Sequence, residues 1–338
     1  MKDLHFPEQR DLDVVPVGRV AIDFNPTEYF RSLVECELFK KYIGGSPANT
    51  AIGLARLGER VGFIGKVSND RFGDYAIHVF QNEGIDTSCL TKVAGNEKLG
   101  LAFTEVISEQ ENGLLMYREG AADLALSMED ISQKYIEKAR AVVISGTALT
   151  ASPSREACIK IMRLVKRTGG VLIFDIDFRP YGWNSRKEAG AYFSIVASES
   201  DIIMGSREEF DLTESFMGAD GSDTDSARLW HSKNAKLLII KHGKQGSNAF
   251  SASGENYRVR PFPVKFMKST GGGDAYSSAL LHGLLRGWAL KDCLEFGSAS
   301  ASMLVGSHSC SADMPTEDAI KEFILAGKKE HGEMVERI

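Results

Sequence analysis

A run of three glycines followed by an aspartate, Gly271-Gly272-Gly273-Asp274, leads directly into a stretch that predicts a helix over 277–286. Glycines carry no side chain that would keep an anion away, and the first N–H groups of a helix point toward the same place. The segment therefore predicts an oxyanion or phosphate site. Asp274 falls in the first helical turn, where it either stabilises the helix dipole or acts as a general base beside the anion.

A second glycine-rich turn, Gly44-Gly45, precedes Ser46, Pro47 and Asn49. Ser46 suits the N-cap and Pro47 the first position of a helix, so we expect a helix to begin there. That helix explains Ser46 and Pro47, but it explains neither the glycine pair nor Asn49. A ligand at the mouth of the helix would explain both, because the glycines leave room for it and Asn49 can reach it.

Polar residues also follow two predicted strands. Asp175, Asp177 and Arg179 come directly after the apolar run 171–174, and Asp23 follows a similar run. Because ligands in open α/β sheets bind outside the carboxyl ends of the strands, these residues are candidates for contact with a polar ligand. A salt bridge between Arg179 and one of the two acids, and a turn-forming role for Asp23, are the alternatives.

Two further motifs allow both a structural and a functional interpretation. Lys241, Gly243 and Gly246 link two strand-like runs, which fits either a tight hairpin or a backbone that approaches a nucleotide. Ser206 and Glu209 form the Ser-x-x-Glu pattern of a capping box at the start of a helix.

The elements that would position these residues alternate between strands and helices. The helical stretches include 154–168 and 187–198. Between them lie short apolar, β-branched runs at 14–17, 61–64, 141–144, 171–174, 202–204 and 237–240. Continuous apolar runs indicate strands that are buried on both faces, so we expect an α/β fold with a mostly parallel sheet covered by helices.

Two segments, 21–43 and 99–118, break this alternation because they hold strand-like pieces without a long helix between them. A polar turn at 108–113 predicts an antiparallel hairpin within the second segment. The two segments form either a small β-lid over the sheet or an irregular edge of it. Arg118 ends the hairpin, and an exposed charge is the usual role of such an arginine.

The composition limits the class of protein. Of the 338 residues, 43% are hydrophobic and 25% are charged, as in a globular protein with a large core. The net charge of −6 argues against general binding to nucleic acids or to anionic membranes. The five cysteines show no CxxC spacing, and we find neither an apolar leader nor a run long enough to span a membrane. We therefore expect a cytoplasmic protein without a zinc site.

The order of these motifs resembles that of the ribokinase-like, or PfkB, carbohydrate kinases. The shared order is an early Asp, Gly-Gly-x-x-x-Asn, a strand followed by Asp-x-Asp-x-Arg-Pro, then Gly-x-x-Gly and Gly-x-Gly-Asp, and it covers residues 13–316. The segment 65–73 matches the first signature of the family. The resemblance implies one three-layer α/β/α kinase domain over 1–338, with a mostly parallel central sheet and with segments 21–43 and 99–118 inserted as a small β-lid.

Several strings are similar to those of one bacterial subgroup of this family. They lie at 44–49, 101–105, 116–119, 145–149, 152–157 and 179–181. That subgroup uses ATP to phosphorylate the C6 hydroxyl of 5-dehydro-2-deoxy-D-gluconate in myo-inositol catabolism, and a related subgroup acts on 2-keto-3-deoxygluconate, which is the alternative substrate. The resemblance thus implies ATP and Mg²⁺ as cofactors, a small sugar acid as the substrate, and a homodimer through the lid as a candidate assembly.

The resemblance also implies roles for the residues at matching positions. Asp274 would be the catalytic base, and the anion hole for the transferred phosphoryl group would be the backbone of Gly271, Gly272 and Gly273. Sugar oxygens would be held by Asp23, Gly45 and Asn49, and the substrate carboxylate by Arg118 and Arg179. The nucleotide would lie along Lys241, Gly243, Gly246 and Gly306, with Glu209 near the magnesium and phosphates. The family usually has Ala at position 272 and Asn at position 206, where this chain has Gly272 and Ser206.

Overall fold

The computed structural model describes residues 4–108, 111–218, 221–265, 267 and 270–338. A ten-stranded sheet forms its middle layer, in the order β14-β13-β12-β11-β10-β9-β8-β1-β4-β5. The parallel strands are β1 (Leu12–Val17), β4 (Gly62–Val67), β5 (Asp86–Lys92), β8 (Ala139–Ser145), β9 (Val171–Asp175), β10 (Ile202–Ser206) and β11 (Leu237–Lys241). One edge is extended by the antiparallel strands β12 (Ser247–Ser251), β13 (Asn256–Val259) and β14 (Val335–Arg337). The prediction of a mostly parallel sheet is confirmed, and each of the six apolar runs lies wholly or largely within one of its strands.

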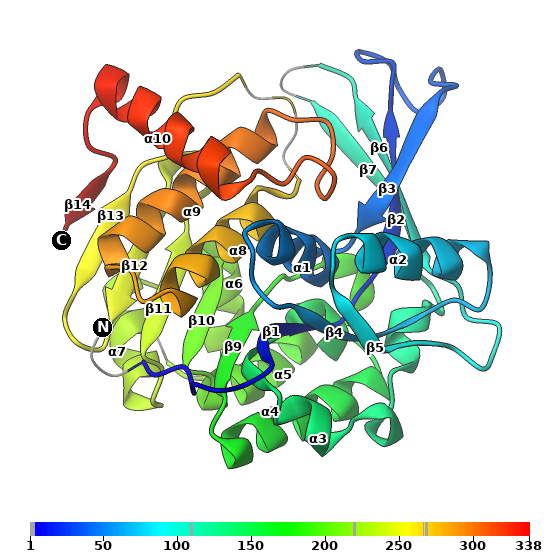
Figure 1. The fold of residues 1–338 in the computed structure, drawn as a ribbon, viewed down its shortest axis with the longest axis horizontal. Helices are drawn as coiled ribbons and strands as arrows, with labels where there is room; N and C mark the ends of the chain where they lie inside the picture. Colours follow the sequence, from blue (N-terminus) through cyan, green and yellow to red (C-terminus); the bar gives the residue numbers. More distant parts are fainter. Residues whose placement is uncertain (1–3, 109–110, 219–220, 266, 268–269) are drawn as a thin grey trace.

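Helices cover both faces of this sheet (Figure 1). One face carries α1 (Ser46–Arg56), α2 (Arg71–Asn82), α8 (Gly272–Leu285), α9 (Leu290–Val305) and α10 (Glu317–His331). The other face carries α3 (Gln133–Ile136), α4 (Ser154–Thr168), α5 (Arg186–Glu199), α6 (Arg207–Glu214) and α7 (Asp223–Ser232). Short 3₁₀ turns lie in the connections: η1 (Ala122–Ala125), η2 (Met128–Asp130), η3 (Gly146–Leu149), η4 (Pro180–Gly182) and η5 (Gly243–Gln245).

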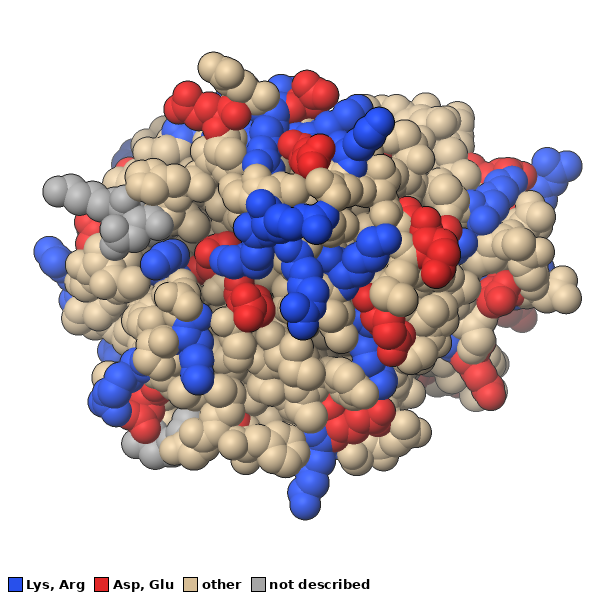
Figure 2. All heavy atoms as spheres, turned by 90° about the horizontal axis from the view of Figure 1, so that it is seen from below, with Lys and Arg blue, Asp and Glu red and all other residues tan. Residues whose placement is uncertain are grey.

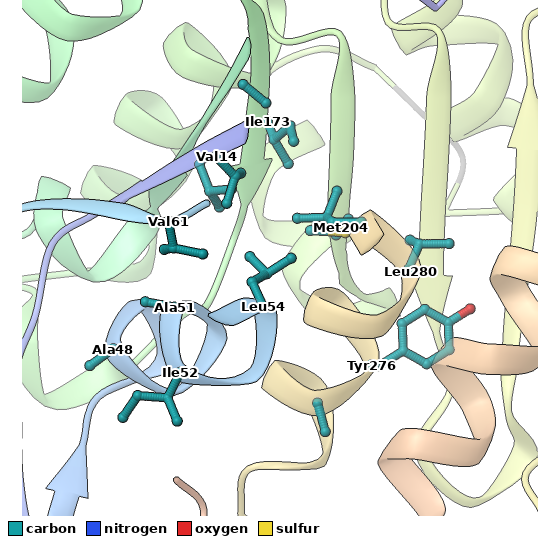
Figure 3. Close-up of a cluster of buried hydrophobic side chains, with 14 of the residues drawn as sticks. Val14, Ala48, Ala51, Ile52, Leu54, Val61, Ile173, Met204, Tyr276 and Leu280 are labelled. Carbon is teal, nitrogen blue, oxygen red and sulfur yellow. The ribbon is translucent and has the colours of Figure 1, made fainter. Parts of the chain in front are cut away.

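The apolar runs are continuous because each strand contributes to two cores. Successive side chains of a strand point to opposite faces of the sheet. Ile173 and Met204 accordingly belong to one buried cluster, whereas Leu172 and Ile203 belong to the cluster on the other face. Figure 3 shows the first cluster, in which α1 and α8 cover the strand residues. This packing fixes α1 and α8, the two helices that begin at the glycine-rich turns.

A second, four-stranded sheet has the order β3-β2-β6-β7, and we call it the lid. Its strands are β2 (Ala21–Pro26), β3 (Phe39–Gly44), β6 (Gly100–Val106) and β7 (Asn112–Tyr117). The parallel pair β2–β6 joins the two segments, and β6–β7 is the expected antiparallel hairpin. Glu109 and Gln110 of its turn lie outside the described residues. The alternative of an irregular edge of the main sheet is wrong, because the four strands form a sheet of their own (upper right in Figure 1).

The lid is attached to the chain that follows α9 through His308. Nδ1 of His308 lies 2.9 Å from the hydroxyl oxygen of Tyr42, and Nε2 lies 2.9 Å from the carbonyl oxygen of Pro26. Nδ2 of Asn25 donates to the carbonyl oxygen of His308 at 2.8 Å. A small cavity at this junction is lined by residues of the lid together with Thr270, which directly precedes the three glycines. The lid therefore lies close to the start of α8.

The face of the molecule away from the lid carries a group of Lys and Arg side chains near its middle, with Asp and Glu side chains around them (Figure 2). Acidic and basic side chains are thus mixed on this face. In the described part of the chain, no helix combines the length and the apolar character that crossing a membrane requires.

Candidate active site

The carboxyl ends of neighbouring parallel strands bring the predicted site residues to one edge of the sheet. Ser145 ends β8 and is in register with Asp175 at the end of β9. Ser206 ends β10 and is in register with Lys241 at the end of β11. The connection that follows β1 reaches the same edge. Residues that lie far apart in the sequence therefore surround the start of α8.

Asp274 lies in the first turn of α8, beside the start of α1. Its Oδ1 accepts a hydrogen bond from Oγ of Ser46 at 2.7 Å, and its Oδ2 accepts one from Nδ2 of Asn49 at 2.8 Å. Burial and the negative charge of Asp177 raise the pKa of Asp274 to about 6, although these two hydrogen bonds favour the carboxylate. A carboxylate with a pKa in this range can accept a proton at neutral pH and pass it on.

The prediction that Ser46 caps α1 is wrong. The N-cap residue is Gly45, and Ser46 is the first residue of the helix. The physical reason is that the Ser46 hydroxyl is bound to Asp274 instead of to the helix backbone. Gly45 has a φ of 97°, and a Cβ at this position would lie 2.6 Å from the carbonyl oxygen of Arg19. A Cβ on Gly44 would collide with the Asp23 carboxylate, so close approach explains the glycine pair.

Two further carboxylates lie near Asp274. Asp177 accepts a hydrogen bond from Oγ of Ser145 at 3.0 Å and forms a salt bridge with Arg179 at 2.7 Å, so the expected alternative of an Asp–Arg pair is confirmed. Although burial opposes the change, the charges of Arg179 and Arg19 lower the pKa of Asp177. Asp175 accepts from Oγ of Ser277 at 3.2 Å.

Asp177 also has an unusual backbone. Its φ is 39°, which lies in the left-handed region that a residue with a Cβ rarely adopts. Such strain persists only where the surroundings hold it, and it is concentrated at functional sites. Here Glu209 holds the loop, because its Oε1 accepts from the backbone N–H of Phe178 at 2.7 Å.

The capping box at the start of α6 is confirmed. Oε2 of Glu209 accepts from the backbone N–H of Ser206 at 2.7 Å, and Oγ of Ser206 accepts from the backbone N–H of Glu209. Burial raises the pKa of Glu209. Both carboxylate oxygens of Glu209 thus accept backbone N–H groups, one from its own helix and one from the loop after β9. Its expected place near the magnesium and phosphates stays a prediction.

A cavity of about 600 Å³ opens between α8, α9 and the hairpin of β11 and β12. The hairpin interpretation of the segment 241–246 is confirmed, and Lys241, Gly243 and Gly246 also line this cavity. Other lining residues are Gly272, Gly273, Tyr276, Phe262, Val264, Ala301, Ser302 and Val305. Gly306 is the exception among the residues expected along a nucleotide: it caps the end of α9, and its neighbour Val305 lines the cavity.

Of the three glycines, Gly273 faces open space at the start of α8, whereas Gly271 and Gly272 pack closely against Cys310 and Val305. Gly271 is the N-cap residue with a φ of 84°, and the helix begins at Gly272. A Cβ on Gly273 would have Nζ of Lys241, 3.7 Å away, as its nearest atom. The first turn of α8 and the Lys241 ammonium therefore border the same open space, which fits the expected anion site.

Arg118 is not an exposed charge, because only 7% of the residue is accessible. Its Nη2 forms a buried salt bridge with Asp123 and donates to the carbonyl oxygen of Thr147 at 3.0 Å. Its Nη1 lies 3.3 Å from Oγ1 of Thr150. The expectation of a surface charge is wrong, and the guanidinium lies beside η3 at the carboxyl end of β8.

Sequence reasoning missed three residues of this arrangement. Ser46 was assigned to a cap, Ser145 was not singled out, and Arg19 was overlooked. Arg19 is 4% exposed and its Nη1 donates to the hydroxyl oxygen of Tyr181 at 2.9 Å. The signal that would have found Arg19 is its position two residues after the first strand, because the connections that follow such strands lie at the ligand-binding edge of the sheet.

The match to a protein family decides the classification. The model of the pfkB family of carbohydrate kinases matches residues 11–317. The chain belongs to this family. The family resemblance of the motifs is confirmed. The 5-dehydro-2-deoxygluconokinase of Clostridium perfringens is 57% identical to it over 337 residues, which are 100% of both chains. The protein of the same name from Geobacillus kaustophilus is 44% identical over 96% of this chain and 97% of its own.

Solved structures share the fold of this chain. A PfkB protein from Polaromonas sp. JS666 is 25% identical, with a TM-score of 0.80 over 92% of this chain and 99% of its own. A putative ribokinase II from Escherichia coli, solved in complex with ATP and Mg²⁺, is 23% identical, with a TM-score of 0.84 over 93% of this chain and 99% of its own. The ribokinase-like α/β fold expected for this PfkB chain is therefore confirmed.

Proposed function

We propose that this protein transfers the γ-phosphoryl group of ATP to the C6 hydroxyl of 5-dehydro-2-deoxy-D-gluconate. The observation that carries the phosphoryl transfer is the placement of Asp274, which has a pKa of about 6 and lies in the first turn of α8, the helix whose Gly272 and Gly273 line the 600 Å³ cavity. Full-length relatives at 44–57% identity that are named for this substrate support the choice of sugar acid.

The residues of the cavity fit ATP. Phe262, Val264 and Val305 offer apolar walls for a purine ring, and the start of α8 with Lys241 offers positive charge for the phosphates. No three acidic, His or Cys side chains in the described residues are grouped to bind a metal by themselves. Mg²⁺ nevertheless fits, because it is commonly bound by one or two carboxylates together with phosphate oxygens and water. Asp175, whose Oδ1 lies 3.7 Å from Nζ of the cavity residue Lys241, would be such a carboxylate. The ion would neutralise charge on the transferred group.

Asp274 and the glycines have different roles in the reaction, which are proton transfer and stabilisation of charge. Asp274 accepts the proton of the C6 hydroxyl while that oxygen forms a bond to the γ-phosphorus. The bond from the γ-phosphorus to the bridging oxygen breaks, and ADP leaves with that oxygen. The N–H groups at the start of α8, from Gly271 to Gly273, stabilise the charge on the transferred group.

The sugar would lie between the lid and the start of α1. Oδ1 of Asn49 is buried and has no hydrogen-bond partner among the described residues, so it can accept a bond from a sugar hydroxyl. Asp23 lies within β2 and against Gly44, so its alternative role as a turn former is wrong. Asp23 and Gly45 stay candidates for contact with sugar hydroxyls. Arg118 and Arg179 stay candidates for contact with the acid end of the sugar.

We expect Ser46→Ala to shift the pH dependence of the reaction. The hydroxyl donates to the Asp274 carboxylate and so favours its charged form. Its loss raises the pKa of Asp274, and the acid limb of kcat/KM against pH, centred near pH 6, moves up by about one unit. Activity at pH 6 falls more than activity at pH 8. An unchanged midpoint, with ATP affinity also unchanged, would show that Asp274 does not govern this limb.

We further propose that the lid forms a homodimer. Phe30, Leu38, Leu115 and Tyr117 expose 64%, 62%, 44% and 60% of their surface, and all four lie in the lid or its connections. A second copy of the same lid would bury them. We expect Leu115→Glu to convert a dimer into a monomer in sedimentation at micromolar concentration, with Leu325→Glu, an exposed leucine on α10, as the matched control. A monomeric wild-type protein would contradict this assembly.

We place the protein in the cytoplasm. Its five cysteines form no disulfide, and thiols stay reduced in that compartment.

A coupled ADP-release assay tests the proposed activity. The purified protein is given MgATP with 5-dehydro-2-deoxy-D-gluconate, 2-keto-3-deoxygluconate or D-fructose. We expect the highest kcat/KM with the first acid. If 2-keto-3-deoxygluconate is the better substrate, it replaces 5-dehydro-2-deoxy-D-gluconate as the proposed substrate, which is the alternative that the family resemblance left open. If none of the three sugars stimulates ADP release, the proposed function is wrong.

A further inference from the structure

Arg19 lies in the short connection between β1 and β2, at the edge of the sheet that holds the site. Only 4% of the residue is exposed. Nη1 donates to the hydroxyl oxygen of Tyr181 at 2.9 Å, whereas Nε is closed off from solvent and has no hydrogen-bond partner among the described residues. Nη2 also has no hydrogen-bond partner in the described part of the chain, but unlike Nε it is not closed off from solvent. Most of the hydrogen-bonding capacity of this guanidinium is therefore unused.

Three arginines meet at the turn η4. Tyr181, the partner of Arg19, belongs to this turn, and Arg179 directly precedes it. A Cβ on Gly182 of the same turn would lie 3.5 Å from Nη1 of Arg118. The three guanidinium groups thus arrive from the connection after β1, from the end of the lid hairpin and from the loop after β9.

The charges of two of these arginines are already compensated. Arg118 forms its buried salt bridge with Asp123, and Arg179 forms its salt bridge with Asp177. Arg19 has no carboxylate oxygen within salt-bridge distance among the described residues. Although burial opposes the change, Tyr181 and the negative charge of Asp177 raise the pKa of Arg19, but the Asp177 carboxylate is already in a salt bridge with Arg179. A bound anion in direct contact with Arg19 would reduce the cost of burying its charge.

We propose that Arg19 binds the carboxylate of the sugar acid and thereby makes the enzyme select acids over neutral sugars; this inference rests on the proposed function. Nε and Nη2 form one edge of the guanidinium, which is the geometry that binds a carboxylate through two parallel hydrogen bonds. Nη2 is the reachable donor, and a carboxylate placed on it would also satisfy Nε. Tyr181 is a positioning residue, because its hydroxyl holds Nη1 and so orients that edge.

Substrate selectivity of Arg19→Met tests this assignment. The variant keeps much of the side-chain volume and removes the donors. We measure kcat/KM for 5-dehydro-2-deoxy-D-gluconate and for D-fructose, a neutral ketose with a C6 hydroxyl. We expect the ratio of the two values to fall by about 30-fold or more, through a rise of about 10–100-fold in KM for the acid. Tyr181→Phe should lower the ratio less. Arg258→Met, at an exposed arginine of β13, is the matched control and should leave the ratio unchanged.

The alternatives give different results. An equal loss on both sugars would show that Arg19 only supports the structure and would overturn the assignment, as would a larger fall in the ratio for Arg118→Met or Arg179→Met. If Arg19→Met does not fold, Arg19→Lys is used instead, because it keeps the charge but cannot form two parallel hydrogen bonds to a carboxylate. We expect an intermediate ratio for this variant. An unchanged ratio overturns the assignment. If the wild-type protein does not phosphorylate the acid, the proposed function fails. If it does and the ratio stays constant in the Arg19 variants, only the role of Arg19 fails.

Discussion

Asp274→Asn should lower kcat by about 10²–10⁴-fold while the affinity for ATP changes little, because the substitution keeps the size of the side chain and removes the general base. The surroundings of Asp274 support this expectation. Two hydrogen bonds, from Ser46 and Asn49, hold its carboxylate, and its pKa of about 6 leaves it ionised at neutral pH. Steady-state kinetics and ATP titration at pH 7.5 measure the two quantities.

Asp74→Asn is the matched control for this substitution. Asp74 lies in the first turn of α2, as Asp274 lies in the first turn of α8, and it is remote from the glycines. If Asp274 acted only on the helix dipole, both variants would lose a little stability and keep their kcat. A kcat within a few-fold of wild type in Asp274→Asn would therefore exclude its role as a base.

Gly273→Val should lower kcat/KM for ATP by about 10²-fold or more without lowering the thermal stability. A Cβ at Gly273 meets no atom closer than Nζ of Lys241 at 3.7 Å, so the folded protein has room for it. The added methyl groups would instead occupy the space in front of the first N–H groups of α8. Loss of donors of this kind costs about 10²–10³-fold in other enzymes. Kinetics and the unfolding midpoint of the same preparation measure the two effects.

Gly271 provides the contrast. Its φ is 84°, and a Cβ there would lie 2.8 Å from Sγ of Cys310, so Gly271→Ala should destabilise the fold as well as impair activity. Gly273→Ala should give a smaller loss of activity than Gly273→Val, because one carbon blocks less of the space. A valine variant with normal ATP kinetics would show that the phosphoryl group does not approach this turn.

The sequence allowed the sheet and its helices to be predicted because their signals are local. Each buried strand needs apolar residues on both faces, so its sequence is a continuous apolar run. The range 154–168 was predicted as a helix and is the whole of α4. The lid was harder to predict from the sequence, because a pair of strands can join either the main sheet or a separate one. Only the parallel pairing of β2 with β6, which are far apart in the chain, places them together.

The site residues were predictable where their role follows from the backbone, at a helix start or at the end of a strand. Glycines at a helix start and polar residues at strand ends mark the positions of Gly271–Gly273, Asp274 and Lys241 without any knowledge of contacts. Side-chain partners were not predictable in this way. Ser46 has the residue type of a cap, and its bond to Asp274 crosses 228 positions of the chain. The burial of Arg118 likewise depends on Asp123 and on β8, which no local pattern reveals.

The central claim is tested most directly by the position of the phosphate in the product. The wild-type protein is incubated with MgATP and 5-dehydro-2-deoxy-D-gluconate, and the product is examined by ³¹P–¹H correlation NMR. The account predicts one phosphate monoester coupled to the two C6 protons, formed in equal amount to ADP, and no such product with Asp274→Asn over the same time. A phosphate on another carbon, or release of inorganic phosphate with ADP and no sugar phosphate, would contradict it.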